Sequence, residues 1–83
     1  MSPIQIKLFY CNIRSYQRNK IAVDMLVNHG KYDLIILTET WLEKDKSVGL
    51  TSSEYAFIDE FSLKEKRGGG IRIIYKRKYL LFK

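Results

Sequence analysis

The sequence predicts a small α/β domain, in which a β-α-β unit is followed by a β-hairpin. Three observations support this fold class: alternating apolar residues near the N-terminus, a helical period that stops at a glycine, and an unbroken apolar run at residues 34–37. The chain has 83 residues, of which 46% are hydrophobic and 29% are charged. Such a composition is typical of one globular domain and argues against disorder.

The first predicted element is a strand at residues 4–12. One of its faces carries the apolar side chains of Ile4, Ile6, Leu8 and Tyr10. The opposite face becomes apolar only near the end, which suits a strand that runs from the margin of a sheet toward a buried end. A polar connection follows, and Ser15 is the N-cap that we expect for the next element.

Residues 18–29 change to a helical period. Ile21, Met25 and His29 form an i, i+4 row, with Ala22, Val23 and Leu26 beside it. We therefore expect these residues to form one apolar face of a helix of about three turns. Gly30 supplies the left-handed position that ends the helix.

Residues 32–38 form the clearest predicted strand. The run at 34–37 is apolar at every position, as expected for a strand buried on both faces of a parallel sheet. A strand, a helix and a second strand with short connections form a β-α-β unit, in which the two strands are parallel. Because functional groups collect at the carboxyl ends of such strands, we expect Asn12 and Glu39 to converge at one edge.

A β-hairpin is predicted for the second half of the chain. In chain order we expect a loop, a strand, a charged turn and a second strand, at residues 44–53, 54–61, 62–66 and 71–76. Gly68, Gly69 and Gly70 open the last strand, where glycines are typical of a bulge or a close backbone approach. They are not a phosphate-binding loop, because no Lys-Ser/Thr pair and no helix follow them.

The charge of the chain is uneven. Residues 1–60 carry seven basic and eight acidic side chains, whereas residues 61–83 carry eight basic and one acidic, a net charge of +7. Arg67, Lys76, Arg77 and Lys78 are therefore candidates for contacts with phosphates. The alternative, which the charge alone favours, is a solvated strand at the edge of the sheet that lysines keep soluble.

Several classes of protein are excluded by composition. The single Cys11 excludes a disulfide framework and a four-ligand zinc site, and the single His29 excludes a mechanism that needs two histidines. The longest uninterrupted apolar run is Leu34 to Leu37, so we expect no membrane partner. No apolar signal segment begins the chain, so we expect an intracellular protein, with the nucleus as one candidate compartment.

Glu39 and Asn12 are the residues best placed for chemistry. A carboxylate after a buried strand suits Mg²⁺, which binds through one or two carboxylates and keeps several waters. An asparagine amide can donate to a phosphate oxygen. Each residue alone is more typical of a solvated or turn position, and their pairing at one edge is what favours a site. We interpret Trp41 as a packing residue, with stacking on a nucleobase as the alternative.

Three motifs in order resemble a known family. They are Asn12-Ile13-Arg14-Ser15, then Leu37-Thr38-Glu39-Thr40-Trp41-Leu42, then Arg67-Gly68-Gly69-Gly70. Together they resemble the start of the endonuclease/exonuclease/phosphatase superfamily, and most of all the apurinic-type endonuclease domain that accompanies reverse transcriptase in non-LTR retrotransposons. The resemblance covers essentially the whole chain, so residues 1–83 correspond to the N-terminal portion of that domain.

The resemblance implies a fold, a cofactor and a partner. Its members are four-layer α/β sandwiches that cleave phosphodiester or phosphomonoester bonds with Mg²⁺ or Mn²⁺, and this branch nicks DNA. Asn12 matches the asparagine that contacts the scissile phosphate, and Glu39 matches the metal-binding glutamate. The family's general base and second sheet have no counterpart in this sequence. We therefore expect an N-terminal fragment that lacks the C-terminal half of its domain, binds metal poorly and is inactive alone.

A second hypothesis comes from a different class of protein. The chain would then be a small basic module that binds nucleic acid or another partner without catalysis. Its binding would depend on the basic C-terminal segment, be sensitive to salt and be independent of Glu39. A third alternative stays within the superfamily and is a phosphatase or deadenylase relative.

Overall fold

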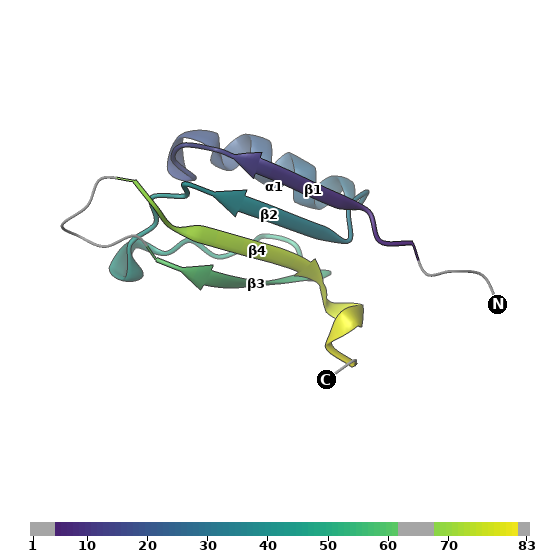
Figure 1. Cartoon of the computed structure of the whole chain (residues 1–83). Coiled ribbons are helices and arrows are strands. Elements are labelled where there is room, and N and C mark those ends of the chain that lie inside the picture. Colours follow the sequence, from purple (N-terminus) through teal and green to yellow (C-terminus); the bar gives the residue numbers. More distant parts are fainter. Residues whose placement is uncertain (1–4, 62–67, 82–83) are drawn as a thin grey trace.

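The strands β1 (Leu8–Asn12) and β2 (Leu34–Thr38) run parallel and pair directly in the computed structural model, which describes residues 5–61 and 68–81 (Figure 1). The helix α1 (Lys20–His29) connects them. This arrangement confirms the predicted β-α-β unit. The described residues form a small mixed α/β domain with one α-helix and a four-stranded sheet.

The hairpin strands complete the sheet. β3 (Tyr55–Glu60) pairs antiparallel with β4 (Ile71–Lys76), and β4 pairs antiparallel with β2, which gives the strand order β1-β2-β4-β3. The hairpin is thus confirmed. β4 lies inside the sheet, so for residues 71–76 the interpretation as a solvated strand edge is wrong. Short 3₁₀ turns are found at Gln17–Asn19, Lys44–Lys46 and Arg77–Leu81.

β1 begins later than predicted. Its ladder starts at Leu8, and Lys7 before it makes a different set of hydrogen bonds. The Lys7 carbonyl accepts from the N–H groups of Asp33 and Leu34 at 2.8 and 3.2 Å, and the Lys7 N–H donates to Asp33 Oδ2 at 2.9 Å. These bonds fix the start of both parallel strands. Ile4 lies outside the described residues.

The helix buries only part of the predicted apolar face, the part that includes Val23, together with Val27, which was not predicted. Ile21 and Met25 are 77% and 68% exposed and His29 is exposed, whereas Val23 and Val27 are buried. The two rows lie roughly 200° apart, since each residue turns the helix by about 100°. Because apolar residues lie on both sides of the helix, the helical period alone does not identify the side that is buried.

The predicted helix caps are confirmed at one end and displaced at the other. Gly30 is left-handed, with φ 74°, and its N–H donates to the Val27 carbonyl at 3.1 Å. Ser15 Oγ accepts from the Arg18 N–H at 3.3 Å. This bond stabilises the 3₁₀ turn that precedes α1, so Ser15 does not cap α1 itself.

The face of the sheet toward α1 carries the core. Its fully buried apolar side chains come from the helix, the central strands and the loops: Tyr16, Val23, Val27, Ile35, Leu37, Leu42, Tyr55 and Ile74. On β2 only alternate residues are fully buried, and Leu34 and Ile36 are half-buried. The prediction that this strand is buried on both faces therefore holds for one face in the described structure.

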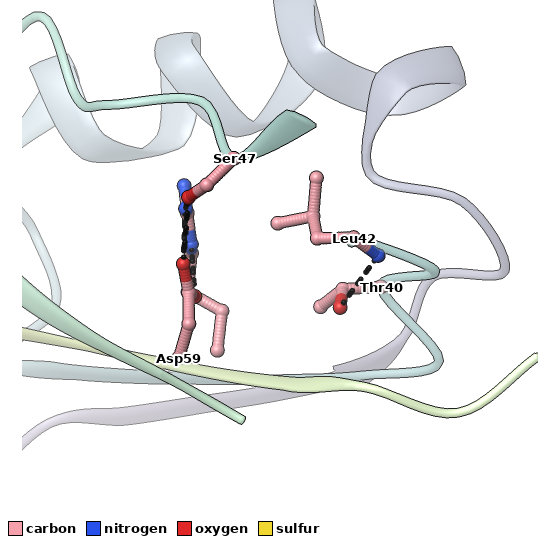
Figure 2. Close-up of polar contacts among 5 residues, drawn as sticks. Thr40, Leu42, Ser47 and Asp59 are labelled. Atoms are coloured by element: carbon pink, nitrogen blue, oxygen red, sulfur yellow. Dashed lines mark hydrogen bonds and ion pairs between the residues drawn. The ribbon is translucent and has the colours of Figure 1, made fainter. Parts of the chain in front are cut away.

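Arg72 of β4 is a fully buried charge within this core. Its Nε and Nη2 donate to the two carboxylate oxygens of Asp59 at 2.6 Å each, and its guanidinium lies 4.6 Å from the ring centre of Tyr16 and 4.1 Å from that of Phe57. Ser47 Oγ donates to the same carboxylate at 3.2 Å (Figure 2). Burial disfavours the charged guanidinium, but the Asp59 carboxylate outweighs it and raises the pKa of Arg72.

The other face of the sheet has no cover among the described residues. Leu8, Tyr10 and Ile58 are 54%, 61% and 59% exposed. The ladder registers place three rows of side chains on this face: Leu8, Leu34, Tyr75 and Ala56; Tyr10, Ile36, Ile73 and Ile58; Asn12, Thr38, Ile71 and Glu60. We call these rows the uncovered sheet face. Apolar surface of this kind is typical of an interface.

The Arg72–Asp59 pair gives a first prediction. Arg72→Leu leaves the Asp59 carboxylate buried without its partner, so we expect a loss of about 3–5 kcal/mol in the free energy of unfolding, enough to unfold a domain of this size. Arg72→Leu combined with Asp59→Leu removes both charges and recovers most of the loss. Urea unfolding followed by circular dichroism measures both changes.

A control is the partly exposed pair of Lys20 and Asp24 on α1, whose side chains are 38% and 20% exposed and whose Nζ–Oδ2 distance is 2.7 Å. Lys20→Ala breaks an i, i+4 pair that solvent partly screens and has far less effect on unfolding. A single Arg72→Leu variant as stable as Lys20→Ala would contradict the importance that we assign to the buried pair.

Candidate functional site

The carboxyl ends of β1 and β2 lie side by side. Asn12 pairs with Thr38 at the end of the ladder, the Ile13 N–H donates to the Thr38 carbonyl at 3.0 Å, and Glu39 follows Thr38 directly. The expectation that Asn12 and Glu39 share one edge is thus confirmed. We call this edge, together with the start of β4, the carboxyl edge.

The pairing continues beyond the strands. The N–H groups of Ser15 and Tyr16 donate to the carbonyls of Glu39 and Thr40 at 2.9 and 2.8 Å, so the two loops stay parallel. On the other side of the second loop, glycine carbonyls from the start of β4 accept hydrogen bonds. These are Thr40 N–H to Gly70 O at 3.2 Å and Trp41 N–H to Gly69 O at 2.9 Å. Three segments that are distant in sequence are thereby held together.

The backbone at this edge adopts strained conformations. Four non-glycine residues of the described chain have positive φ, and all lie in the two loops: Arg14 at 46°, Ser15 at 94°, Glu39 at 55° and Trp41 at 58°. Side chains with a Cβ rarely adopt this region, and such residues cluster at functional sites. These conformations could not be predicted from the residue types, since none of the four is Asn or Asp, the residues that tolerate them best.

The Glu39 carboxylate faces the glycines that precede β4. Its Oε2 accepts a hydrogen bond from the Gly69 N–H. A Cβ at Gly68 would lie 3.2 Å from Glu39 Oε2 and 3.3 Å from Trp41 Nε1. The prediction of a close backbone approach is confirmed here. The glycine motif therefore supports the carboxylate, a role that its sequence alone did not indicate.

Trp41 does not pack in the core as predicted. Its neighbours Thr40 and Leu42 are each only 2% exposed, whereas Trp41 is 42% exposed. Figure 2 shows Thr40 and Leu42 joined by the hydrogen bond from the Leu42 N–H to Thr40 Oγ1, at 3.4 Å. With positive φ at Glu39 and Trp41, the loop turns Thr40 and Leu42 inward and leaves Trp41 at the surface.

Asn12 is exposed and lies at one side of a cavity. The cavity, of about 300 Å³, lies between β1 and α1 and is lined mainly by apolar side chains, including Phe9, Val23 and Leu26. The half-buried Cys11 lines it too. The cavity adds no charged group to the carboxyl edge.

The basic candidates lie at the other end of the sheet. Lys76 ends β4, about 17 Å along the strand from Ile71 at the carboxyl edge, as the rise of about 3.4 Å per residue gives. Its Nζ is 3.5 Å from Asp33 Oδ1. Arg77 and Lys78 are exposed, and Lys78 Nζ lies 5.2 Å from the ring centre of Tyr79. These residues are therefore not brought together with Asn12 and Glu39.

Asp33 is the acidic centre of that opposite end. The hydrogen bond from the Lys7 N–H lowers the pKa of Asp33, and Tyr79 and Lys76 lower it further. Lys76 is thus engaged with a carboxylate of the chain itself. Arg67, the fourth basic candidate, lies outside the described residues.

The carboxyl edge fits part of a metal site. Within residues 5–61 and 68–81, no three His, Cys, Asp or Glu side chains are grouped so that they could hold a metal ion. A Mg²⁺ ion needs only one or two carboxylates when substrate oxygens and waters complete its shell. Glu39, with one oxygen held by Gly69, suits such a single ligand, and Asn12 lies at the same edge, at the end of the neighbouring strand.

The comparisons with known proteins leave the family unassigned. Neither protein-family models nor curated proteins nor solved structures match the chain. In the parts of the chain that the structure describes, no helix has the length and apolar character needed to span a membrane. The functional conclusion therefore depends on the geometry of the carboxyl edge and on the resemblance of its motifs.

Gly69 and Gly70 give a second prediction. Gly69→Ala places a Cβ in open space at φ 80°, so we expect only the cost of the left-handed conformation, about 1–2 kcal/mol of unfolding free energy. Gly70→Ala has φ 89° and also brings a Cβ to 2.5 Å from Thr40 Oγ1, which belongs to a stiff, buried side chain. We therefore expect Gly70→Ala to lose more unfolding free energy than Gly69→Ala. Denaturant unfolding gives the ranking.

Gly49→Ala is the control for this series, because its φ is not positive and no atom lies within 4 Å of the added Cβ. We expect a change within about 0.5 kcal/mol. Equal losses at Gly49, Gly69 and Gly70 would contradict the close approach between the glycines and the loop after β2.

Proposed function

We propose that this chain is the N-terminal part of a metal-dependent phosphodiesterase of the endonuclease/exonuclease/phosphatase superfamily, of the kind that nicks DNA in non-LTR retrotransposons. The observation that carries this proposal is the register of the two parallel strands. It pairs Asn12 with Thr38, so that Asn12 and the Glu39 that follows Thr38 lie at one edge of the sheet. Carboxyl ends of parallel strands are where ligand sites form in α/β proteins.

The residues at the carboxyl edge have distinct roles in this proposal. Glu39 would hold Mg²⁺ or Mn²⁺, and a bound ion supplies a Lewis acid for phosphoryl oxygens and for the leaving oxygen. The Gly69 N–H fixes Glu39 Oε2 and so orients the carboxylate. Asn12, exposed at the end of β1, would donate its amide hydrogens to the scissile phosphate.

The uncovered sheet face supports the four-layer part of this proposal. Two sheets of a sandwich pack face to face about 10 Å apart and bury their apolar rows against each other. The exposed Leu8, Tyr10 and Ile58 would be buried by the second sheet of such a sandwich. In this proposal the second sheet comes from the C-terminal half of the domain.

The general base is the group that this chain does not offer. His29, its one histidine, is exposed at the end of α1, next to the start of β2 and at the opposite end of the sheet from Glu39. It therefore does not reach the carboxyl edge. We propose that the chain contributes a phosphate contact and a metal ligand and is not a complete catalyst.

The alternative of a basic binding module has less support. Lys76 already pairs with Asp33, which leaves Arg77 and Lys78 as the exposed basic residues of this group in the described chain. Each phosphate contact changes the logarithm of affinity by about 0.9 for each tenfold change in salt, so Arg77 and Lys78 alone would give only a shallow dependence on salt.

A third prediction tests the metal ligand directly. In NMR spectra of the labelled chain, paramagnetic Mn²⁺ broadens signals near its binding site, and we expect the broadening at the backbone N–H groups of Glu39, Thr40 and Gly69. Binding is weak, because one carboxylate holds the ion. Glu39→Gln keeps the shape of the side chain but removes its charge, so the local broadening is lost.

Glu60→Gln is the matched control, because Glu60 is an exposed carboxylate at the same end of the sheet, two strands away from Thr38. This variant retains the broadening at Glu39. If the signals broaden elsewhere, or broaden equally in Glu39→Gln, the metal part of the proposal fails.

A fourth prediction concerns activity. The isolated chain leaves supercoiled plasmid intact in the presence of Mg²⁺, because the carboxyl edge lacks a general base. Gel electrophoresis of the plasmid measures nicking. Nicking by the chain that is abolished by Glu39→Ala would show that the described residues are sufficient for catalysis, and the proposed division of the site would be wrong.

A further inference from the structure

Trp41 is an exposed aromatic side chain beside the Glu39 carboxylate. It is the single tryptophan of the chain and is 42% exposed. Its Nε1 and Glu39 Oε2 lie 3.3 and 3.2 Å from the point that a Gly68 Cβ would occupy. Both groups therefore meet at Gly68, and part of the indole reaches solvent within a few ångströms of the carboxylate.

The position of Trp41 is imposed by the backbone on both sides. The Trp41 N–H donates to the Gly69 carbonyl at 2.9 Å, and the next side chain, Leu42, is buried. Trp41 keeps a φ of 58°, which a bulky side chain rarely adopts. A tryptophan that is partly exposed and held in a conformation of this kind is a candidate for a role in binding, since such residues cluster at functional sites.

We propose that Trp41 stacks against a nucleobase next to the phosphodiester group that lies at Glu39. This inference depends on the proposed function and adds to it a contact with a base, beside the contact with the phosphodiester group. An exposed aromatic ring beside a phosphate-binding edge is the arrangement with which proteins hold single-stranded nucleic acid, since every base has a stacking face. Trp41 would select substrate without reading its sequence.

The intrinsic fluorescence of the chain reports on this contact without a label, because Trp41 is the sole tryptophan. The chain is titrated in the presence of Mg²⁺, in which it is expected to leave nucleic acid intact, with a single-stranded oligonucleotide of ten thymidines, and separately with an abasic oligonucleotide of the same length and charge. We expect the thymidine oligonucleotide to quench Trp41 and the abasic one to leave its emission unchanged. No quenching, or equal quenching by both, overturns the proposal.

Variants of Trp41 test the same contact when the signal comes from a labelled oligonucleotide. Anisotropy of a labelled ten-thymidine oligonucleotide measures its affinity, and Trp41→Ala should weaken binding about fivefold or more, as expected for the loss of one stacked base. Trp41→Phe keeps an aromatic face and should restore most of the affinity. Ile21→Ala is the control, since Ile21 is 77% exposed on α1. Unchanged affinity in Trp41→Ala, or an equal loss in Ile21→Ala, contradicts the stacking role.

Different experimental outcomes contradict the stacking role of Trp41 and the metal site at Glu39. Mn²⁺ broadening at Glu39 without quenching by thymidines overturns the stacking role and leaves the metal site in place. Quenching without Mn²⁺ broadening overturns the metal site and leaves Trp41 as a base-stacking residue. If Trp41→Ala fails to fold by circular dichroism, the quenching titration of the unaltered chain and the Trp41→Phe variant still decide the question.

Discussion

The buried ion pair between Arg72 and Asp59 is the interaction on which the arrangement of the sheet depends. The two residues face each other across β3 and β4, and Arg72 also pairs with Leu37 of β2 in the ladder. A guanidinium without a partner would not remain at 0% exposure, so Asp59 allows β4 to occupy the interior of the sheet. Gly70 lies two residues before Arg72. Because the Arg72–Asp59 pair holds β4 in place, the approach of the preceding glycines to Glu39 depends on this buried ion pair.

Much of the fold could be predicted because it depends on local patterns. The period of residues 18–29, the glycine at position 30 and the apolar run before Glu39 specify a β-α-β unit without long-range information. The buried face of α1 could not be predicted, since apolar residues lie on both of its sides. The ion pair had one signal: Asp59 follows Tyr55 and Phe57 on the apolar face of a predicted strand, where a carboxylate needs a cation opposite.

In the candidate site, too, some features could be predicted from local patterns and others depend on contacts between distant residues. Two strand ends of a parallel pair meet at one edge whatever their side chains are, so the convergence of Asn12 and Glu39 follows from topology alone. The exposure of Trp41 depends instead on hydrogen bonds from the loop after β2 to Gly69 and Gly70, more than 25 residues later in the sequence. Pattern reasoning within a short window does not detect such bonds. The classification of Trp41 as a packing residue failed for this reason.

Because one face of the sheet is uncovered, the stability of this domain depends on which molecules bind that face. Any molecule that binds the folded rows of Leu8 and Tyr10, and not the unfolded chain, shifts the folding equilibrium by mass action. At a hundred times its dissociation constant such a binder adds about 2.7 kcal/mol, a large share of the stability of a small domain. A melting temperature for this chain therefore has meaning only together with the concentration of any such binder in the sample.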